Sequence, residues 1–332
     1  MNLHAYHLYF DAPLHIGVEG IGQERIEQTV HSDTLWGALV QNWSLLFEDS
    51  PEDLAQSCPF KVSSCFPLVN GQRYFPIPDR AKEDLGRELE ASGELKEGIQ
   101  FKDLKKISYL SEPLMHKVLQ GVPLGIVALQ EQGSHLPCIH INASPHTTIS
   151  QRPRLRIDRC TGTVEGENFF YCSDQYFGSG NGLFFLLQCD DPAVRAKFEA
   201  ALRLLADNGL GADRSVGRGT FSFSRHDFDM PVETKAPSYY LLSLYHPTRE
   251  ELREGLLKQS TYTLKRRSGH AAAPGVGNLR RSDIWMIAEG AALSREADGD
   301  IAKVIAKGGP APHPVFRYGK ALTLPLAPRR KA

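Results

Sequence analysis

The chain has 332 residues, of which 41% are hydrophobic and 23% are charged, a composition typical of a globular protein with a buried core. Every apolar run falls short of the roughly 18 residues that a membrane-spanning helix needs, and the six cysteines lack the paired spacing of a zinc ribbon. The net charge of −1 gives no overall attraction to nucleic acid, and the N-terminus lacks the features of a signal peptide, so we expect a cytoplasmic protein.

The first unit, residues 1–229, predicts strands and helices in a β-α-β-β-α-β order, interrupted by a proline-rich insertion at about 48–150. Alternating polarity indicates strands, and apolar residues at helical spacing indicate helices. We expect strands at 2–10, 182–189 and 220–224, a hairpin of 154–160 with 168–177, and helices at 31–47 and 192–208. Ser32 or Asp33 is expected to cap the first helix, and Gly209 to end the second.

A second unit, residues 230–332, begins after the segment MPVETKAP. We expect strands at 239–247, 262–269, 282–293 and 315–326, with a helix at 249–258. The fold class predicted is therefore α+β, with two ferredoxin-like (RRM-like) domains in tandem, the first carrying the large insertion and a glycine-rich loop.

Charge is segregated along the chain although its sum is close to zero. Residues 48–53 and 83–97 are acidic, whereas 151–159 carries four arginines against one aspartate, and 265–281 carries five lysines and arginines without an acid. Such segregation is typical of a protein in which one face meets phosphate, although basic loops that are merely solvated remain an alternative.

The glycine-rich segment GLGADRSVGRGTF (209–221) is the most informative motif. Runs of glycine allow close backbone approach, and exposed N–H groups with Arg214 and Arg218 suit phosphate oxygens. The order helix, loop, strand is the reverse of a dinucleotide-binding fingerprint or a P-loop, which disfavours a nucleotide-hydrolysing enzyme. The alternative is a glycine-rich turn with solvated arginines.

Three further segments are candidates for RNA contact. On a strand, Arg154 and Arg156 would share one face, which leaves either a phosphate-binding strand or a charged edge strand. Residues 264–281 indicate either a clamp on nucleic acid or a mobile loop. The cluster His31-Ser32-Asp33 lacks the geometry of a catalytic triad, since adjacent residues cannot converge on one point, and is better explained as a helix start that could also hold a phosphate.

Together, HSDTLWGAL (31–39), LRIDRCTGTVEGENFFY (155–171), GLGADRSVGRGTF and SLYHP (243–247) resemble the RAMP superfamily and, within it, the fourth subunit of the type III-A CRISPR (Csm) complex. The resemblance implies a non-catalytic subunit for antiviral defence that holds the 5′ handle of the crRNA. It also implies contacts with the large cyclase/polymerase-like subunit and with a backbone RAMP subunit, and a hairpin "thumb", for which 75–150 is our guess.

The resemblance and the basic segments described above together indicate which residues bind RNA. They are His31, Ser32, Arg154, Arg156, Arg159, Gly209, Gly211, Arg214, Ser215, Gly217, Arg218, Gly219, Lys265, Arg266, Arg267 and Gly269. No metal, cofactor or catalytic residue is expected. The main alternative is a RAMP endoribonuclease that processes guide RNA, with His31 as general base. A stand-alone RNA-binding protein and an enzyme acting on a phosphorylated metabolite are further alternatives.

Overall fold

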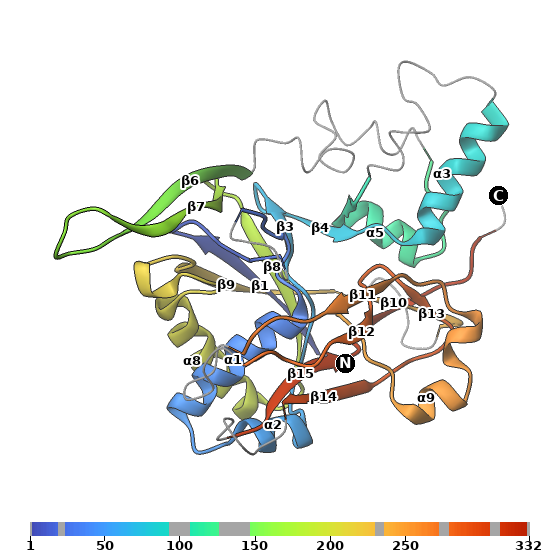
Figure 1. Cartoon of the computed structure of the whole chain (residues 1–332). Helices are drawn as coiled ribbons and strands as arrows, with labels where there is room; N and C mark the ends of the chain where they lie inside the picture. Colours follow the sequence, from blue (N-terminus) through green and yellow to red (C-terminus); the bar gives the residue numbers. More distant parts are fainter. Residues whose placement is uncertain are drawn as a thin grey trace.

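The computed structural model describes residues 2–18, 24–92, 107–125, 147–229, 236–271, 279–305 and 313–330 (Figure 1). It is a mixed α/β structure with several antiparallel sheets, as the predicted class requires. No helix in these ranges is long and apolar enough to cross a membrane.

The largest sheet is built around β1 (Leu3–Phe10), which lies between β8 (Gly182–Gln188) and β9 (Phe221–Asp227). Beyond β8 the sheet continues through β3 (Phe66–Val69), and all of these neighbours are antiparallel. Strand β3 falls within the stretch expected to be an insertion, so part of that stretch belongs to the main sheet. The sequence predicted β1, β8 and β9 correctly because their apolar residues alternate or form a continuous buried run.

Helices α1 (Ser32–Leu46) and α8 (Pro192–Asn208) share one hydrophobic core with one face of this sheet. Tyr6 stacks on Phe185 across the two central strands, at 5.3 Å between ring centroids, and Phe198 of α8 packs against both rings. Helix α8 starts at a proline and ends at Gly209, whose N–H donates to the Leu205 carbonyl, so the expected helix and its glycine end are confirmed.

The opposite face of the sheet carries a second core. It includes side chains of α5 (Glu112–Leu119), of β4 (Gln72–Pro76) and of β5 (Tyr109–Ser111), together with strands of the C-terminal unit. The stretch 48–92 further contains α2 (Pro51–Ser57), β2 (Lys61–Val62) and α3 (Asp79–Ser92). It is therefore more regular than its many prolines indicated.

A long hairpin of β6 (Thr147–Ile157) and β7 (Val164–Phe177) projects from the body of the molecule (Figure 1). The predicted hairpin is confirmed, and its strands are longer than the sequence indicated. Its base is joined to the body by paired backbone hydrogen bonds of 2.9 Å between Leu14 and Gln175.

The C-terminal unit consists of small separate sheets. Strand β10 (Ser238–Leu241) lies between β13 (Ala292–Leu293) and β16 (Thr323–Leu326). The other strands pair in twos, β11 (Leu264–Arg267) with β12 (Ile284–Ile287), and β14 (Gly299–Ile305) with β15 (Val315–Lys320).

Three single elements expected in this unit are each divided in the structure. The strand at 282–293 is broken by a turn at Gly290, whose φ is 92°, and its halves β12 and β13 join different sheets. The strand at 315–326 likewise splits into β15 and β16. The helix at 249–258 is α9 (Arg249–Arg253), followed after Gly255 by the 3₁₀ turn η4 (Leu256–Gln259). The boundary between 229 and 230 stays a prediction, and 230–235 lie outside the described residues.

Candidate nucleic-acid interface

The glycine-rich loop packs against its own chain. An added Cβ at Gly209, Gly211 or Gly219 would collide with the carbonyl oxygen of Arg218, His15 or Leu210 respectively, and all three glycines have positive φ. The Gly219 N–H also donates to Pro13 O at 3.0 Å. The close backbone approach that the sequence indicated is therefore made between loop segments, and these glycines shape the loop.

The tip of this loop faces solvent. Arg214–Val216 form the 3₁₀ turn η3, in which Ser215 and Val216 are exposed, and the Cβ position of Gly217 faces open space. Among the described side chains Arg214 has no carboxylate partner within ion-pair distance. Its guanidinium is therefore available to an anion outside the protein.

Arg218, by contrast, is held inside an ionic cluster at the base of the hairpin. Its guanidinium contacts the fully buried carboxylate of Asp174 on β7, and its Nε lies 3.9 Å from Asp213. Arg154 of β6 donates to the same Asp213 carboxylate at 2.7 Å. Arg154 and Arg218, both expected at the RNA interface, thus join the hairpin to the glycine-rich loop.

The same cluster contains the one group of metal-ligand type found among the described residues. Atoms of His15, Cys172 and Asp174 lie within 4.8 Å of one another. However, His15 Nδ1 lies 2.6 Å from the Ser173 carbonyl oxygen, and the Arg218 guanidinium already neutralises Asp174. Burial and the nearby Asp213 raise the pKa of the Cys172 thiol, which disfavours the thiolate that a metal needs. The group is best described as an ion-pair cluster.

The hairpin carries exposed cations and exposed apolar side chains. Arg159 is exposed in the turn, and Arg152 lies 5.2 Å from the ring centroid of Tyr176. Arg156 lies on β6, and its side chain is outside the described residues. The exposed large apolar residues of the hairpin are Ile149, Leu155, Ile157, Val164, Phe169, Phe170 and Tyr171.

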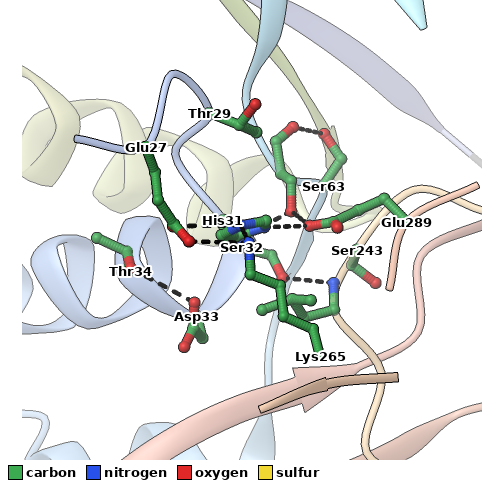
Figure 2. A network of polar contacts seen from close by, with 12 residues as sticks. Glu27, Thr29, His31, Ser32, Asp33, Thr34, Ser63, Ser243, Lys265 and Glu289 are labelled. Atoms are coloured by element: carbon green, nitrogen blue, oxygen red, sulfur yellow. Dashed lines mark hydrogen bonds and ion pairs between the residues drawn. The ribbon is translucent and has the colours of Figure 1, made fainter. Parts of the chain in front are cut away.

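His31 occupies the N-cap position of α1, where its buried ring lies between two carboxylates (Figure 2). Nδ1 donates to Glu289 at 2.7 Å, whereas Nε2 lies 2.6 Å from Lys265 Nζ and 3.3 Å from Glu27. Burial alone would lower the pKa of His31, but the charge of Glu289 and hydrogen bonds to Glu27 and Glu289 raise it to about 9. Nε2 accepts from the lysine when the ring is neutral and donates to Glu27 when it is charged. In both cases neither ring nitrogen is left to act as a general base.

Ser32 and Asp33 connect α1 to the C-terminal unit, so the expectation that one of them caps α1 is wrong. The Ser32 hydroxyl accepts from the Leu244 N–H at 2.9 Å, and the Ser32 N–H donates to Ser64 Oγ at 2.8 Å. Its hydroxyl is thereby used in the contact with the second unit, and its N–H, the first of the helix, is already satisfied within the protein.

Asp33 binds two arginines of the C-terminal unit. Arg267 of β11 donates to its two oxygens at 3.0 and 3.1 Å, and Arg317 of β15 contacts the same carboxylate. Both guanidiniums are buried, and Arg317 also donates to Ser268 O at 2.7 Å. Burial alone would raise the pKa of Asp33, but the two arginines hold it well below its usual range. Arg267, expected to bind RNA, therefore lies in the contact between the two units.

The neighbouring basic residues of β11 are nearer the surface. Lys265 bridges to Glu27 at 2.8 Å and is partly exposed, whereas Arg266 points outward. Gly269, with φ of 99°, follows the strand and lies beside Arg281. The residues 272–278 of the expected clamp lie outside the described ranges.

One connection joins the glycine-rich loop to β11; we call it the strap, residues 11–18 and 24–30. At one end the Ala212 N–H of the loop donates to His15 O at 2.9 Å. At the other end the side chain of Glu27 pairs with Lys265 and Arg267. The strap thus fixes the loop and β11 within one structure, together with the hairpin.

Sequence reasoning missed three residues of the network around α1. Two are Glu27 and Glu289, which lie on either side of His31 (Figure 2), and the third is Arg317, which contacts Asp33. They are distant in sequence from the HSD motif, and a lone buried charge gives no local pattern. The available signal was Asp33 at the start of an apolar helix, because a carboxylate buried there needs a charged partner from elsewhere in the chain.

The chain matches two protein-family models. Residues 7–222 match the RAMP superfamily, and residues 234–326 match the CRISPR Csm4 C-terminal domain. A curated protein of Thermococcus onnurineus strain NA1, "CRISPR system Cms protein Csm4", is 23% identical over 275 residues, which cover 82% of this chain and 88% of that protein.

Solved structures share the fold over the whole chain. A "Csm1-Csm4 cassette in complex with pppApA" matches with a TM-score of 0.61 and 19% identity, covering 99% of both chains. A "Csm3-Csm4 subcomplex in the type III-A CRISPR-Cas interference complex" matches with a TM-score of 0.59 and 17% identity, covering 99% of this chain and 100% of that one.

Proposed function

The chain belongs to the RAMP superfamily, and we propose that it is the Csm4-type subunit of a type III-A CRISPR interference complex. In this role it binds the 5′ handle of the crRNA and joins the large cyclase/polymerase-like subunit to a backbone RAMP subunit in the cytoplasm. The names of its relatives support this reading, since they describe Csm4 chains in complexes with Csm1 and with Csm3.

The observation that carries the RNA-binding proposal is the set of exposed cations on the loop, the hairpin and β11. Arg214 at the loop tip, Arg159 in the hairpin turn and Arg266 on β11 are at least partly exposed, and the strap fixes their three elements in one structure. Phosphate contacts fix the position of an RNA, and separated cations on a rigid frame suit a single strand that passes over them.

The environment of His31 supports a non-catalytic subunit over the endoribonuclease alternative. A general base must reach the substrate proton and leave one ring nitrogen free. His31 is buried and both of its nitrogens are engaged by Glu289 and by Lys265 or Glu27. Its role is to hold the two units together.

The architecture also fits the finer expectations of the family. We interpret the first unit as ferredoxin-like because its strands lie in the order β3-β8-β1-β9, with α1 after β1 and α8 after β8. The second unit, with its separate small sheets, is a more diverged version. The hairpin β6–β7 is the projecting element suited to the thumb, in place of our guess of 75–150.

Neutralising two exposed arginines tests this proposal. Arg159→Gln with Arg214→Gln removes two cations that have no carboxylate partner among the described side chains, so folding should be unaffected. We expect the RNA affinity of the full chain to fall at least about tenfold, and the slope of log affinity against log salt to decrease by about 1.4, that is about 0.7 per lost phosphate contact.

The matched control is Arg253→Gln, an exposed arginine on α9. It should leave both the affinity and the salt slope unchanged. An RNA affinity that does not respond to the double substitution would refute binding over the loop tip and the hairpin. Arg218 is avoided because its loss would leave Asp174 buried and unpaired.

A further inference from the structure

The ribbon of β11 and β12 has two different faces. Residues directly opposite each other in an antiparallel pair share a face, and Arg266 is opposite Trp285. The alternate residues Lys265 and Arg267 turn to the other face, where they meet Glu27 and Asp33. One face is thereby used within the protein. On the other face Leu264, Arg266 and Trp285 are exposed, and Ile287 at the end of β12 is buried.

Trp285 is unusual among the tryptophans of the chain. Of the three, Trp36 and Trp43 are 3% and 2% exposed, whereas Trp285 is 60% exposed. Leaving a large aromatic side chain in water forgoes the stabilisation that its burial would give, and tryptophan is enriched at surfaces that bind a partner.

Two arginines accompany this ring. The side chains of Arg266 and Arg280 are 55% and 69% exposed, and both lie near a single carboxylate, Asp283, at 3.7 and 3.6 Å. These distances are too long for direct hydrogen bonds, so the guanidinium donors remain available to another acceptor. The described part of this surface therefore combines an aromatic plane with a net positive charge.

We propose that Trp285, Arg266 and Arg280 form a stacking platform for one unpaired base of the bound RNA. The indole stacks on the base, and the guanidiniums bind the adjacent phosphate. This combination of an aromatic plane with cations beside it is how proteins hold single-stranded nucleic acid without reading its sequence. The inference rests on the proposed RNA-binding function and adds a site to it.

A single-stranded RNA fits this surface better than a protein partner does. Leu264 is the one other exposed large apolar side chain of the ribbon among the described residues, so the apolar area is small for a protein interface. The charge instead suits phosphate. Lys265, adjacent in sequence, is bound to Glu27 of the strap, and His15 of the strap is bound to the glycine-rich loop, so the ribbon that carries the platform is joined to that loop.

The test uses the fluorescence of the full chain. Because Trp36 and Trp43 are buried, iodide quenching reports mainly on Trp285. Addition of a single-stranded RNA carrying the handle sequence should quench this tryptophan and protect it from iodide, and the same RNA in a duplex should not. Trp285→Ala should weaken single-strand binding, measured by polarisation of a labelled RNA, roughly 5- to 150-fold. Trp285→Phe, which keeps an aromatic ring, should stay within about threefold of the unchanged chain.

Leu252→Ala is the control, since it removes an exposed apolar side chain on α9 and should change nothing. If RNA binds but Trp285→Ala leaves the affinity unchanged, the platform is refuted while the proposed function stands. If Trp285→Ala spares RNA binding and instead releases a partner subunit from the purified complex, the surface is a protein interface, and the platform is again refuted. If no RNA binds in the polarisation assay, the proposed function itself fails.

Discussion

The carboxylate of Asp33 connects α1 to two strands of the C-terminal unit, and its removal should lower the free energy of unfolding of the chain. Its side chain is buried, binds Arg267 through both oxygens at 3.0 and 3.1 Å and contacts Arg317. Asp33→Ala would leave two buried guanidiniums without their main partner. Arg267 would keep Glu27 at 3.4 Å, and Arg317 would keep the Ser268 carbonyl at 2.7 Å.

The expected loss follows from these remaining contacts. Removing one partner of a buried ion pair costs about 3–5 kcal/mol because a charge is left uncompensated. Since each arginine keeps at least one acceptor, and Arg267 also donates to Thr34 Oγ1 at 3.2 Å, we expect the lower end, about 3 kcal/mol. At about 2.1 cal/mol/K per residue, the 332 residues give an unfolding entropy of about 0.7 kcal/mol/K, so a loss of about 3 kcal/mol should lower the midpoint of thermal unfolding by about 4 °C.

Thermal unfolding followed by circular dichroism measures this effect. Asp300→Ala, which removes an exposed aspartate on β14, is the matched control and should shift the free energy of unfolding by less than about 0.5 kcal/mol. An Asp33→Ala variant as stable as this control would show that the two units do not depend on the buried carboxylate, and would refute the account of the HSD motif given above.

Two further predictions concern the same network and the loop. The pKa of His31 is raised from 6.5 to about 9 in the folded chain, so its contribution to stability should be complete below about pH 6.5 and lost as the pH rises to about 9. Urea unfolding across this range should show a decline that His31→Gln removes, and an equal decline in the variant would contradict the assignment. Gly219→Ala should destabilise the chain by about 2 kcal/mol or more, because its Cβ would collide with the Leu210 carbonyl, whereas Gly217→Ala, which meets open space, should cost about 1 kcal/mol through its positive φ alone. Equal losses of unfolding free energy in these two variants would show that the loop backbone is not fixed by internal packing.

The sequence predicted the elements whose periodicity is strong. Strand β1, helices α1 and α8 and the hairpin all carry alternating or helical patterns over many residues, and all are confirmed. The C-terminal unit was predicted less well because its strands are short. A turn at Gly290 and the two residues between β15 and β16 redirect the chain into other sheets. Strands of four residues, such as β12 and β16, are too short for an alternating pattern to show where such a turn lies.

For the candidate site, the sequence indicated the basic segments but did not show which of their arginines are paired within the protein. Arg154, Arg218 and Arg267 were expected to face RNA, but each is paired with an aspartate that lies far away in the sequence. Long-range ion pairs of this kind leave no local signal. Trp285 was expected only as one residue of an apolar strand, and because Met286 and Ile287 beside it are buried, the sequence did not show that Trp285 is exposed.

The central claim is that this chain holds the 5′ handle of a guide RNA within a larger complex. Purifying the chain from its native host, then sequencing the bound RNA and identifying the bound proteins, tests it most directly. The account predicts short RNAs that share one 5′ sequence, recovered together with a large cyclase/polymerase-like subunit. Recovery of the chain alone, with turnover of added repeat RNA that depends on His31, would contradict it.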